Sequence, residues 1–261
     1  MSRPHEFRIV FEDRFLIAVD KPARLLTVPT PRGERNTLVH LIERYLEHRG
    51  ARPHASPVRP GSDRTRAGSS SSGRRPAWRR SARIVEVVHR LDRDTSGLLV
   101  FAKDAPTGED LRAQFFDHRA ERIYLAVVAG RMQLDRGTFD SYLATNRGLH
   151  RYSSGPQGEG ERAVTHYRVR ERSPHATLVE VRLETGRRTQ IRVHFAEAGH
   201  PVIGDRRYGG ARAAPPGRSD RMALHATVLG IVHPATGEAM RWESPPPGVF
   251  RTFLVRGRDS R

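Results

Sequence analysis

Apolar residues in this sequence occur in short runs that suit strands better than long helices. Residues 15–19, 98–102 and 124–128 are compact apolar runs, and runs of that length are typical of buried strands. In residues 179–184, apolar and charged side chains alternate, as in a strand with one face on the core and one in solvent. Because the connections are short, most of these strands are expected to pair antiparallel. The pattern predicts an α+β (mixed α/β) fold: a mixed, mostly antiparallel sheet with flanking helices and loops.

Three segments have helical spacing instead. Residues 37–50, 107–116 and 188–199 each place apolar side chains on one helical face. In the second segment, Thr107 and Asp110 form a capping-box pair, so we expect that helix to open at Thr107. The third ends at a glycine, a common helix stop. In the first segment the side chains expected to face the core are Leu38, Leu41, Ile42, Tyr45 and Leu46. In the second they are Leu111 and Phe115, with Phe116 as a further candidate. In the third they are Ile191, either His194 or Phe195, and Ala198.

The charge balance is strongly positive. The chain has 46 lysines and arginines against 29 acidic residues, a formal net charge of +17. Only Lys21 and Lys103 are lysines, so 44 of the 46 basic residues are arginines. A coding bias explains arginine in place of lysine, but it does not explain the excess over the acids. Since the planar guanidinium binds phosphate through two parallel hydrogen bonds, nucleic acid is the partner that the charge predicts.

Several classes of protein are excluded or disfavoured. The sequence has no cysteine, so it has no disulfide, no thiolate metal site and no cysteine nucleophile. Its first residues carry charges where a signal peptide needs an apolar core. The longest apolar runs are far below the ~18 residues that a membrane-spanning helix needs. We therefore expect a cytoplasmic protein without membrane contact.

Residues 51–83 differ in composition from the rest of the chain. They hold nine arginines, a single acid (Asp63) and a run of four serines, with almost no large apolar side chains. Such a segment buries too little surface to offset chain entropy, so we expect a disordered insertion. It is either a passive loop or an arm that binds RNA. The expected organisation is a single domain over residues 1–255, interrupted by this insertion and followed by a frayed tail at 256–261.

Two polar stretches carry side chains suited to chemistry. Residues 89–99 (HRLDRDTSGLL) combine basic, acidic and hydroxyl side chains in a loop between two predicted strands. The same residue types are ordinary in turns, so composition alone leaves catalytic and structural roles open. Residues 185–194 (TGRRTQIRVH) end a strand and open a helix, where arginines beside unpaired backbone N–H groups favour anion binding. A solvated first helical turn is the alternative. Neither a G-x-S-x-G elbow nor a P-loop is present.

Taken together, these stretches resemble the RluA family of pseudouridine synthases. The matching segments follow in family order: FEDRFLIAVDKPARLLTVP (11–29), HRLDRDTSGLL (89–99), RIYLAVVAG (122–130), TGRRTQIRVH (185–194), GHPVIGDRRYG (199–209) and LHA…HPATGE (224–238). The resemblance implies the pseudouridine synthase catalytic fold and isomerisation of selected uridines in structured RNA, with no cofactor and no metal. In that reaction the C1′–N1 bond breaks, the uracil turns over, and C5 is joined to C1′.

The resemblance also implies roles for individual residues. Asp92 matches the essential carboxylate, which can attack C1′, stabilise an oxocarbenium-like centre or take a proton from the ribose. Arg192 matches its cationic partner. Tyr124 matches the active-site tyrosine, whose ring can stack on the freed uracil. Arg90 matches a residue that enters the RNA where the target base has flipped out.

Further basic residues are expected to contact the RNA backbone, although each alone also suits a solvated surface charge. They are Arg187, Arg188, Arg206 and Arg207. Asp94 is a weaker catalytic candidate and is expected to act in capping or in turn geometry. The chain departs from the family pattern at Thr189, where members often carry histidine, and at Arg24, where glycine is frequent. Neither position belongs to the implied catalytic set.

The implied substrate is structured RNA, with large-subunit ribosomal RNA the commonest target class and transfer RNA next. We expect a monomer without the small N-terminal RNA-binding domain of many relatives. Two alternatives are a non-catalytic RNA-binding or assembly protein on the same fold, and a glycoside hydrolase that uses Asp92 and Asp94. A pure binder has no need for a carboxylate facing a polyanion. Two acids so close in one loop are poorly placed to flank a sugar bond.

Overall fold

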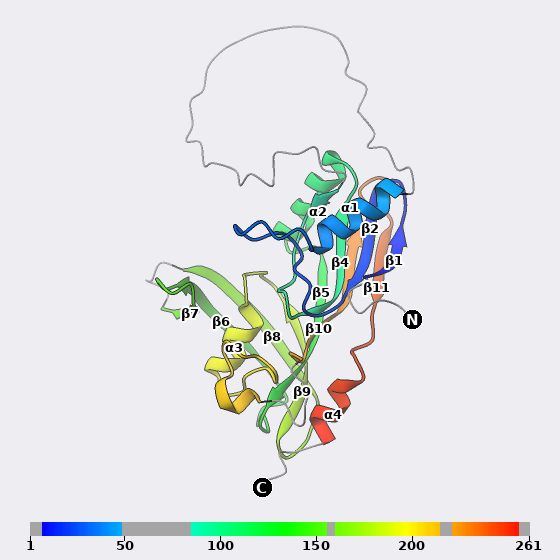
Figure 1. The fold of residues 1–261 in the computed structure, drawn as a ribbon. Coiled ribbons are helices and arrows are strands. Elements are labelled where there is room, and N and C mark those ends of the chain that lie inside the picture. The colour runs from blue at the N-terminus through cyan, green and yellow to red at the C-terminus, as the bar shows by residue number, and fades with distance from the viewer. Residues whose placement is uncertain (1–6, 49–84, 156–159, 215–220, 256–261) are drawn as a thin grey trace, which may run out of the picture.

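The computed structural model describes residues 7–48, 85–155, 160–214 and 221–255. The insertion expected at 51–83 and the tail expected at 256–261 lie outside these ranges. In the part of the chain that is described, eleven strands form one sheet in the order β1-β2-β4-β10-β5-β9-β8-β6-β7, with β11 on β10 and β3 on β4 (Figure 1). All of these pairs are antiparallel except β10 with β4. The mixed, mostly antiparallel sheet is as predicted.

The strands are β1 (Arg8–Glu12), β2 (Leu16–Lys21), β3 (Glu86–Val87), β4 (Ser96–Ala102), β5 (Glu121–Ala129), β6 (Arg136–Thr145), β7 (Arg151–Ser154), β8 (Glu161–Arg172), β9 (Ala176–Leu183), β10 (Leu224–Val232) and β11 (Ala239–Glu243). The helices are α1 (Leu38–His48), α2 (Ala105–Phe116), α3 (Gln190–Glu197) and α4 (Val249–Val255), with a short 3-10 helix over Gly210–Ala213. None of the helices described is long and apolar enough to cross a membrane.

Strand β4 is continuously apolar because both of its faces are covered. Leu99 and Phe101 pack in the same core cluster as the apolar residues of α1. Leu98 and Val100 face the opposite way, into a cluster with residues of α2. Every residue of β4 is buried, which explains why its sequence shows no apolar–polar alternation. Figure 1 shows α1 and α2 near this end of the sheet and α3 near the end formed by β6, β7 and β8.

Three details of the predicted helices are wrong. Helix α2 begins at Ala105, because Asp104 is the N-cap and accepts a hydrogen bond from the Thr107 backbone N–H at 2.8 Å. The capping box expected at Thr107 and Asp110 therefore does not open the helix. Phe116, the further core candidate, is 83% exposed. Helix α3 ends before Ala198, whose side chain is exposed rather than buried.

The end of the loop that carries Asp92 is fixed by the sheet. Gly97 lies opposite Ala226 in the parallel pair of β4 with β10. Its φ is 113°, and an added Cβ would lie 2.2 Å from the Ala226 carbonyl oxygen. Only glycine tolerates both conditions without rearrangement. The loop before β4 thus enters the sheet beside β10. The strand on the other side of β10 is β5, which carries Tyr124.

Candidate active site

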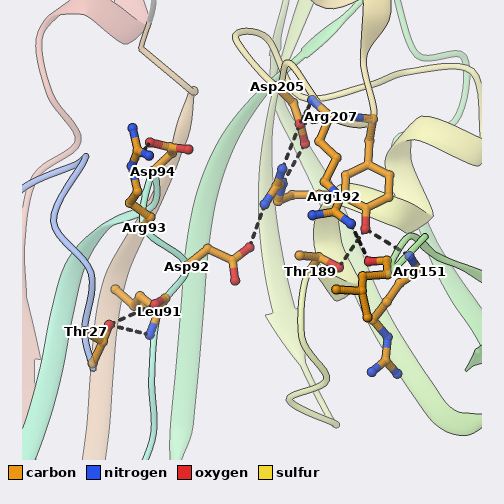
Figure 2. A network of polar contacts seen from close by, with 12 residues as sticks. Thr27, Leu91, Asp92, Arg93, Asp94, Arg151, Thr189, Arg192, Asp205 and Arg207 are labelled. Atoms are coloured by element: carbon orange, nitrogen blue, oxygen red, sulfur yellow. Dashed lines mark hydrogen bonds and ion pairs between the residues drawn. The ribbon is translucent and has the colours of Figure 1, made fainter. Parts of the chain in front are cut away.

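The loop that carries Asp92 is held from behind by buried groups. The Thr27 hydroxyl donates to the Leu91 carbonyl oxygen at 2.8 Å, as Figure 2 shows. Lys21 is fully buried, and its Nζ donates to the carbonyl oxygens of Leu25 at 2.8 Å and Arg93 at 3.1 Å. Burial lowers the pKa of Lys21 to about 7, against the raising effect of Asp94 and Asp92. These contacts leave the loop little freedom to move Asp92.

Arg192, on α3, joins Asp92 to a second carboxylate. Its Nη1 donates to Asp92 Oδ2 at 2.9 Å, while Nε and Nη2 donate to the two oxygens of Asp205 at 2.7 and 2.9 Å. Asp205 Oδ1 also accepts the backbone N–H groups of Arg207 and Tyr208. The Asp205 side chain is 0% exposed, compared with 20% for Asp92. Burial lowers the pKa of Arg192, but its bonds to Asp205 and Asp92 outweigh this and raise it.

The network therefore orients one guanidinium from two sides. Nε and Nη2 of the Arg192 guanidinium donate to the two oxygens of Asp205, and this paired geometry fixes the plane of the guanidinium. The Tyr208 ring lies under the same guanidinium, 5.1 Å from its central carbon, and the Tyr208 hydroxyl lies 3.2 Å from Thr189 Oγ1. The remaining nitrogen, Nη1, presents its hydrogen to Asp92 (Figure 2). Asp92 thus faces a cation whose position the fold determines.

Six of the residues selected from the sequence line one cavity of about 150 Å³, whereas Arg206 and Arg207 line a second one. Asp92, Tyr124 and Arg192 lie on its wall, together with Arg90, Arg187 and Arg188. A cavity of about this size holds a single six-membered ring such as benzene. Its other lining residues are Leu91, Thr95, Leu183, Gly186, Thr189, Gln190, Ile191 and Leu224. The structure thus brings together four segments of the chain around a space suited to one flat base.

The basic residues differ in how they are held. Arg90 and Arg188 are exposed. Arg187 is exposed too, but its Nη1 donates to Glu161 at 3.1 Å and its Nε donates to the Arg162 carbonyl oxygen. The Arg187 backbone N–H is bound by the Gln190 side chain at 2.9 Å. An anion at the start of α3 would therefore meet the arginine side chains rather than that backbone group.

Tyr124 lies on β5 and is 8% exposed. Burial raises its pKa, with Arg122 lowering it and Asp92 raising it further. The hydroxyl is therefore protonated at neutral pH. Burial lowers the pKa of Arg122, which donates to the Glu184 carbonyl oxygen at 3.1 Å.

Asp94, the second carboxylate of the loop, does not line the cavity with Asp92. It pairs with Arg93 at 3.5 Å and lines a second cavity together with Arg206 and Arg207. The two acids therefore do not face one sugar bond, which removes the geometric basis for a glycoside hydrolase. Within the described ranges, no group of three or more histidine or acidic side chains is arranged to hold a metal ion.

Sequence reasoning missed Asp205, although it falls in the matched segment 199–209. A usable signal exists in Arg192 itself. A guanidinium has five N–H donors, and a buried one needs more than a single carboxylate to be satisfied. A further acceptor near Arg192 is therefore expected, and Asp205 supplies it.

Two histidines beside the site, the buried His194 and the half-buried His89, link stability to pH. His194, two residues after Arg192, contacts Ser141 at 3.0 Å and Thr165 at 2.9 Å. Burial lowers the pKa of His194 to about 4. His89 stacks on Phe115, and burial, aided by Arg122, lowers its pKa to about 3. Both rings are neutral in the folded protein at neutral pH.

We expect the folded protein to lose stability as the pH falls from about 6.5, the pKa of an unfolded histidine, towards 4. In this window the unfolded chain binds more protons than the folded one. His194 alone is expected to lower the free energy of unfolding by about 2 kcal/mol between pH 7.5 and pH 5. Urea unfolding at the two pH values measures the difference, and His194→Gln is expected to reduce it. A variant with an unchanged pH dependence would contradict the assignment.

The comparisons with known proteins agree on one family. Residues 15–197 match the RNA pseudouridylate synthase family. The chain is 36% identical to the ribosomal large subunit pseudouridine synthase D of Pseudomonas aeruginosa, over 100% of this chain and 75% of the relative. It is 35% identical to the protein of the same name from Zymomonas mobilis, over 96% and 74%. Human RNA pseudouridylate synthase domain containing 4 has a similar fold, with a TM-score of 0.68 and 19% identity over 95% of this chain and 91% of that one.

Proposed function

Because the chain belongs to the RluA family of RNA pseudouridylate synthases, and is thus an isomerase that converts uridine to pseudouridine in RNA, we propose that it modifies large-subunit ribosomal RNA and that Asp92 is its catalytic carboxylate. The observation that carries the assignment of Asp92 is the single cavity that Asp92, Tyr124 and Arg192 share. The ribosomal substrate is supported by the names of the similar proteins from Pseudomonas and Zymomonas.

In this proposal Asp92 acts on the ribose of the flipped uridine. Arg192 binds Oδ2 of Asp92, so the other carboxylate oxygen is assigned to the sugar. An ionised oxygen there can attack C1′, stabilise the positive charge that develops as the C1′–N1 bond breaks, or take a proton from the ribose. Arg192 acts by holding the carboxylate. The Tyr124 ring stacks on the uracil while C5 turns towards C1′.

The target base must leave its stack before it can enter the cavity. Flipping a nucleotide costs a few kcal/mol. Arg90 is exposed at the edge of the cavity, and we assign it to the space that the base leaves. Arg187 and Arg188 lie on the same wall and are assigned to the backbone beside the flipped nucleotide.

The enzyme acts as a monomer in the cytoplasm, through a single catalytic domain. The segment 51–83 lies outside the described residues, and its composition is the basis for assigning it either as an RNA-binding arm or as a passive loop. The non-catalytic alternative has no support from the family match.

The substrate is tested by incubating the protein with unmodified transcripts of large-subunit ribosomal RNA and of transfer RNA. Pseudouridines are then mapped by reverse transcription after carbodiimide treatment. We expect new pseudouridine in the ribosomal transcript and none in the transfer RNAs. Modification of the transfer RNAs alone would contradict the ribosomal assignment while leaving the activity intact.

A further inference from the structure

Arg122 is a cation near the catalytic cavity, outside the network that holds Asp92. It lies on β5, two residues before Tyr124, so both side chains project from the same face of the strand. The Arg122 side chain is half-buried, and its Nε is shut off from solvent without a hydrogen-bond partner among the described residues. Its Nη2 donates to the Glu184 carbonyl oxygen at 3.1 Å.

The tip of Arg122 lies against the wall of the catalytic cavity. A Cβ added to Gly186, which lines that cavity, would lie 2.5 Å from Arg122 Nη1. The absence of a side chain at position 186 is therefore what lets the guanidinium come so close to the wall. Burial raises the pKa of Tyr124, while Arg122 lowers it and Asp92 raises it further. The charge of Arg122 thus reaches the ring on which the base is proposed to stack.

Arg122 differs from Arg192 in what balances its charge. Arg192 is bound by two carboxylates, those of Asp92 and Asp205. In the described part of the chain, Arg122 forms no ion pair: its partners are the neutral Glu184 carbonyl oxygen and the Phe115 ring, whose centre lies 5.6 Å from the guanidinium carbon. A partly buried cation without a counter-ion costs free energy, and that cost is recovered when a negative charge forms nearby.

The reaction creates such a charge on the base. When the C1′–N1 bond breaks, both of its electrons leave with the uracil, which becomes an anion while C1′ becomes electron-poor. This holds whether Asp92 attacks C1′, stabilises an oxocarbenium-like centre or takes a proton from the ribose. The anion then joins its C5 to C1′, C5 loses a proton and N1 gains one, so the product is an isomer of the substrate.

We propose that Arg122 stabilises the negative charge of the freed uracil through the cavity wall, and so speeds the breaking of the C1′–N1 bond. A fixed charge that is stronger for the transition state than for the neutral base lowers the barrier. The position of the base rests on the proposed function, in which the uracil stacks on Tyr124 beside Gly186. The inference is independent of which RNA carries the uridine, because the leaving uracil is the same.

The test compares two transcripts of large-subunit ribosomal RNA, one made with uridine and one with 5-fluorouridine. Fluorine withdraws electrons and stabilises the uracil anion by itself, so the contribution of Arg122 becomes smaller. Cleavage of the C1′–N1 bond is followed in single turnovers, as the loss of the substrate nucleoside at the modified position after digestion and chromatography. We expect Arg122→Gln to be slower than the wild type by about 100-fold on uridine and by less than about tenfold on 5-fluorouridine.

Two further variants separate charge from packing. Arg122→Lys keeps the positive charge and is expected to recover most of the rate that Arg122→Gln loses on uridine. Arg136→Gln is a matched loss of an exposed arginine that lines neither cavity, and it is expected to act like the wild type on both transcripts. Saturating enzyme in each single turnover removes any difference in RNA affinity between the variants.

Equal losses of Arg122→Gln on the two transcripts would overturn the inference, since Arg122 would then act by packing on Phe115. A wild-type rate for Arg122→Gln on uridine would overturn it as well. Should Arg122→Gln fold poorly, Gly186→Ala tests the same contact, because the added Cβ displaces the flexible tip of Arg122, and the same smaller loss on 5-fluorouridine is expected. A wild type that modifies transfer RNA alone would contradict the proposed substrate, and the comparison is then made on that transcript.

Discussion

Replacing Arg192 by methionine is expected to destabilise the folded protein by about 3–5 kcal/mol and to abolish pseudouridine formation. The Asp205 side chain is 0% exposed and would lose two charge-assisted hydrogen bonds at once. An unpaired buried carboxylate is far more costly than a missing surface ion pair. Asp92 would lose the contact at 2.9 Å that orients it. Urea unfolding measures the first effect, and pseudouridine formation on ribosomal RNA measures the second.

A second variant separates the two effects. In Arg192→Met combined with Asp205→Asn, no charge is left buried without a partner, and the amide oxygen can still accept the backbone N–H groups of Arg207 and Tyr208. We expect this double variant to recover at least half of the lost stability while remaining inactive. If Arg192→Met is as stable as the wild type, Asp205 does not depend on Arg192 and the network described here is wrong.

The sheet was predictable because its signal is local. The apolar run that became β4 shows in sequence that the strand is buried on both faces, since no polar residue alternates along it. The start of α2 was not predictable in the same way. Asp104 and Thr107 are both good N-cap residues, and the position where the chain leaves β4 decides between them. That position is fixed by tertiary contacts, such as the bond from the Lys103 backbone N–H to the Phe15 carbonyl oxygen at 2.7 Å.

The candidate site depends on contacts between distant segments. Asp92 and Arg192 are 100 residues apart in the chain, and Tyr124 comes from a third segment. Spacing alone does not bring such residues together, so their grouping was inferred from the resemblance to a family. Asp205 has no direct contact with the cavity that Asp92 lines and acts through Arg192. Its role became visible only when the partners of Arg192 were known.

Replacing Asp92 by asparagine is expected to lower the activity by a factor on the order of 10⁴ or more. Asparagine has nearly the same shape and can still accept a hydrogen bond from Arg192. It lacks the negative charge that each proposed role at the ribose requires. Since Asp92 is one residue in a strongly basic surface, RNA affinity is expected to persist or to rise slightly. Arg136→Ala serves as the control for a distant substitution.

The most direct test uses ribosomal RNA transcribed with uridine that carries tritium at C5. Joining C5 to C1′ expels that hydrogen, so tritium released into water counts each pseudouridine formed. The wild type is expected to release tritium in step with the pseudouridine mapped in the product, and Asp92→Asn is expected to release none while still binding the RNA. Release by Asp92→Asn at the wild-type rate would contradict the assignment of Asp92 as the catalytic carboxylate.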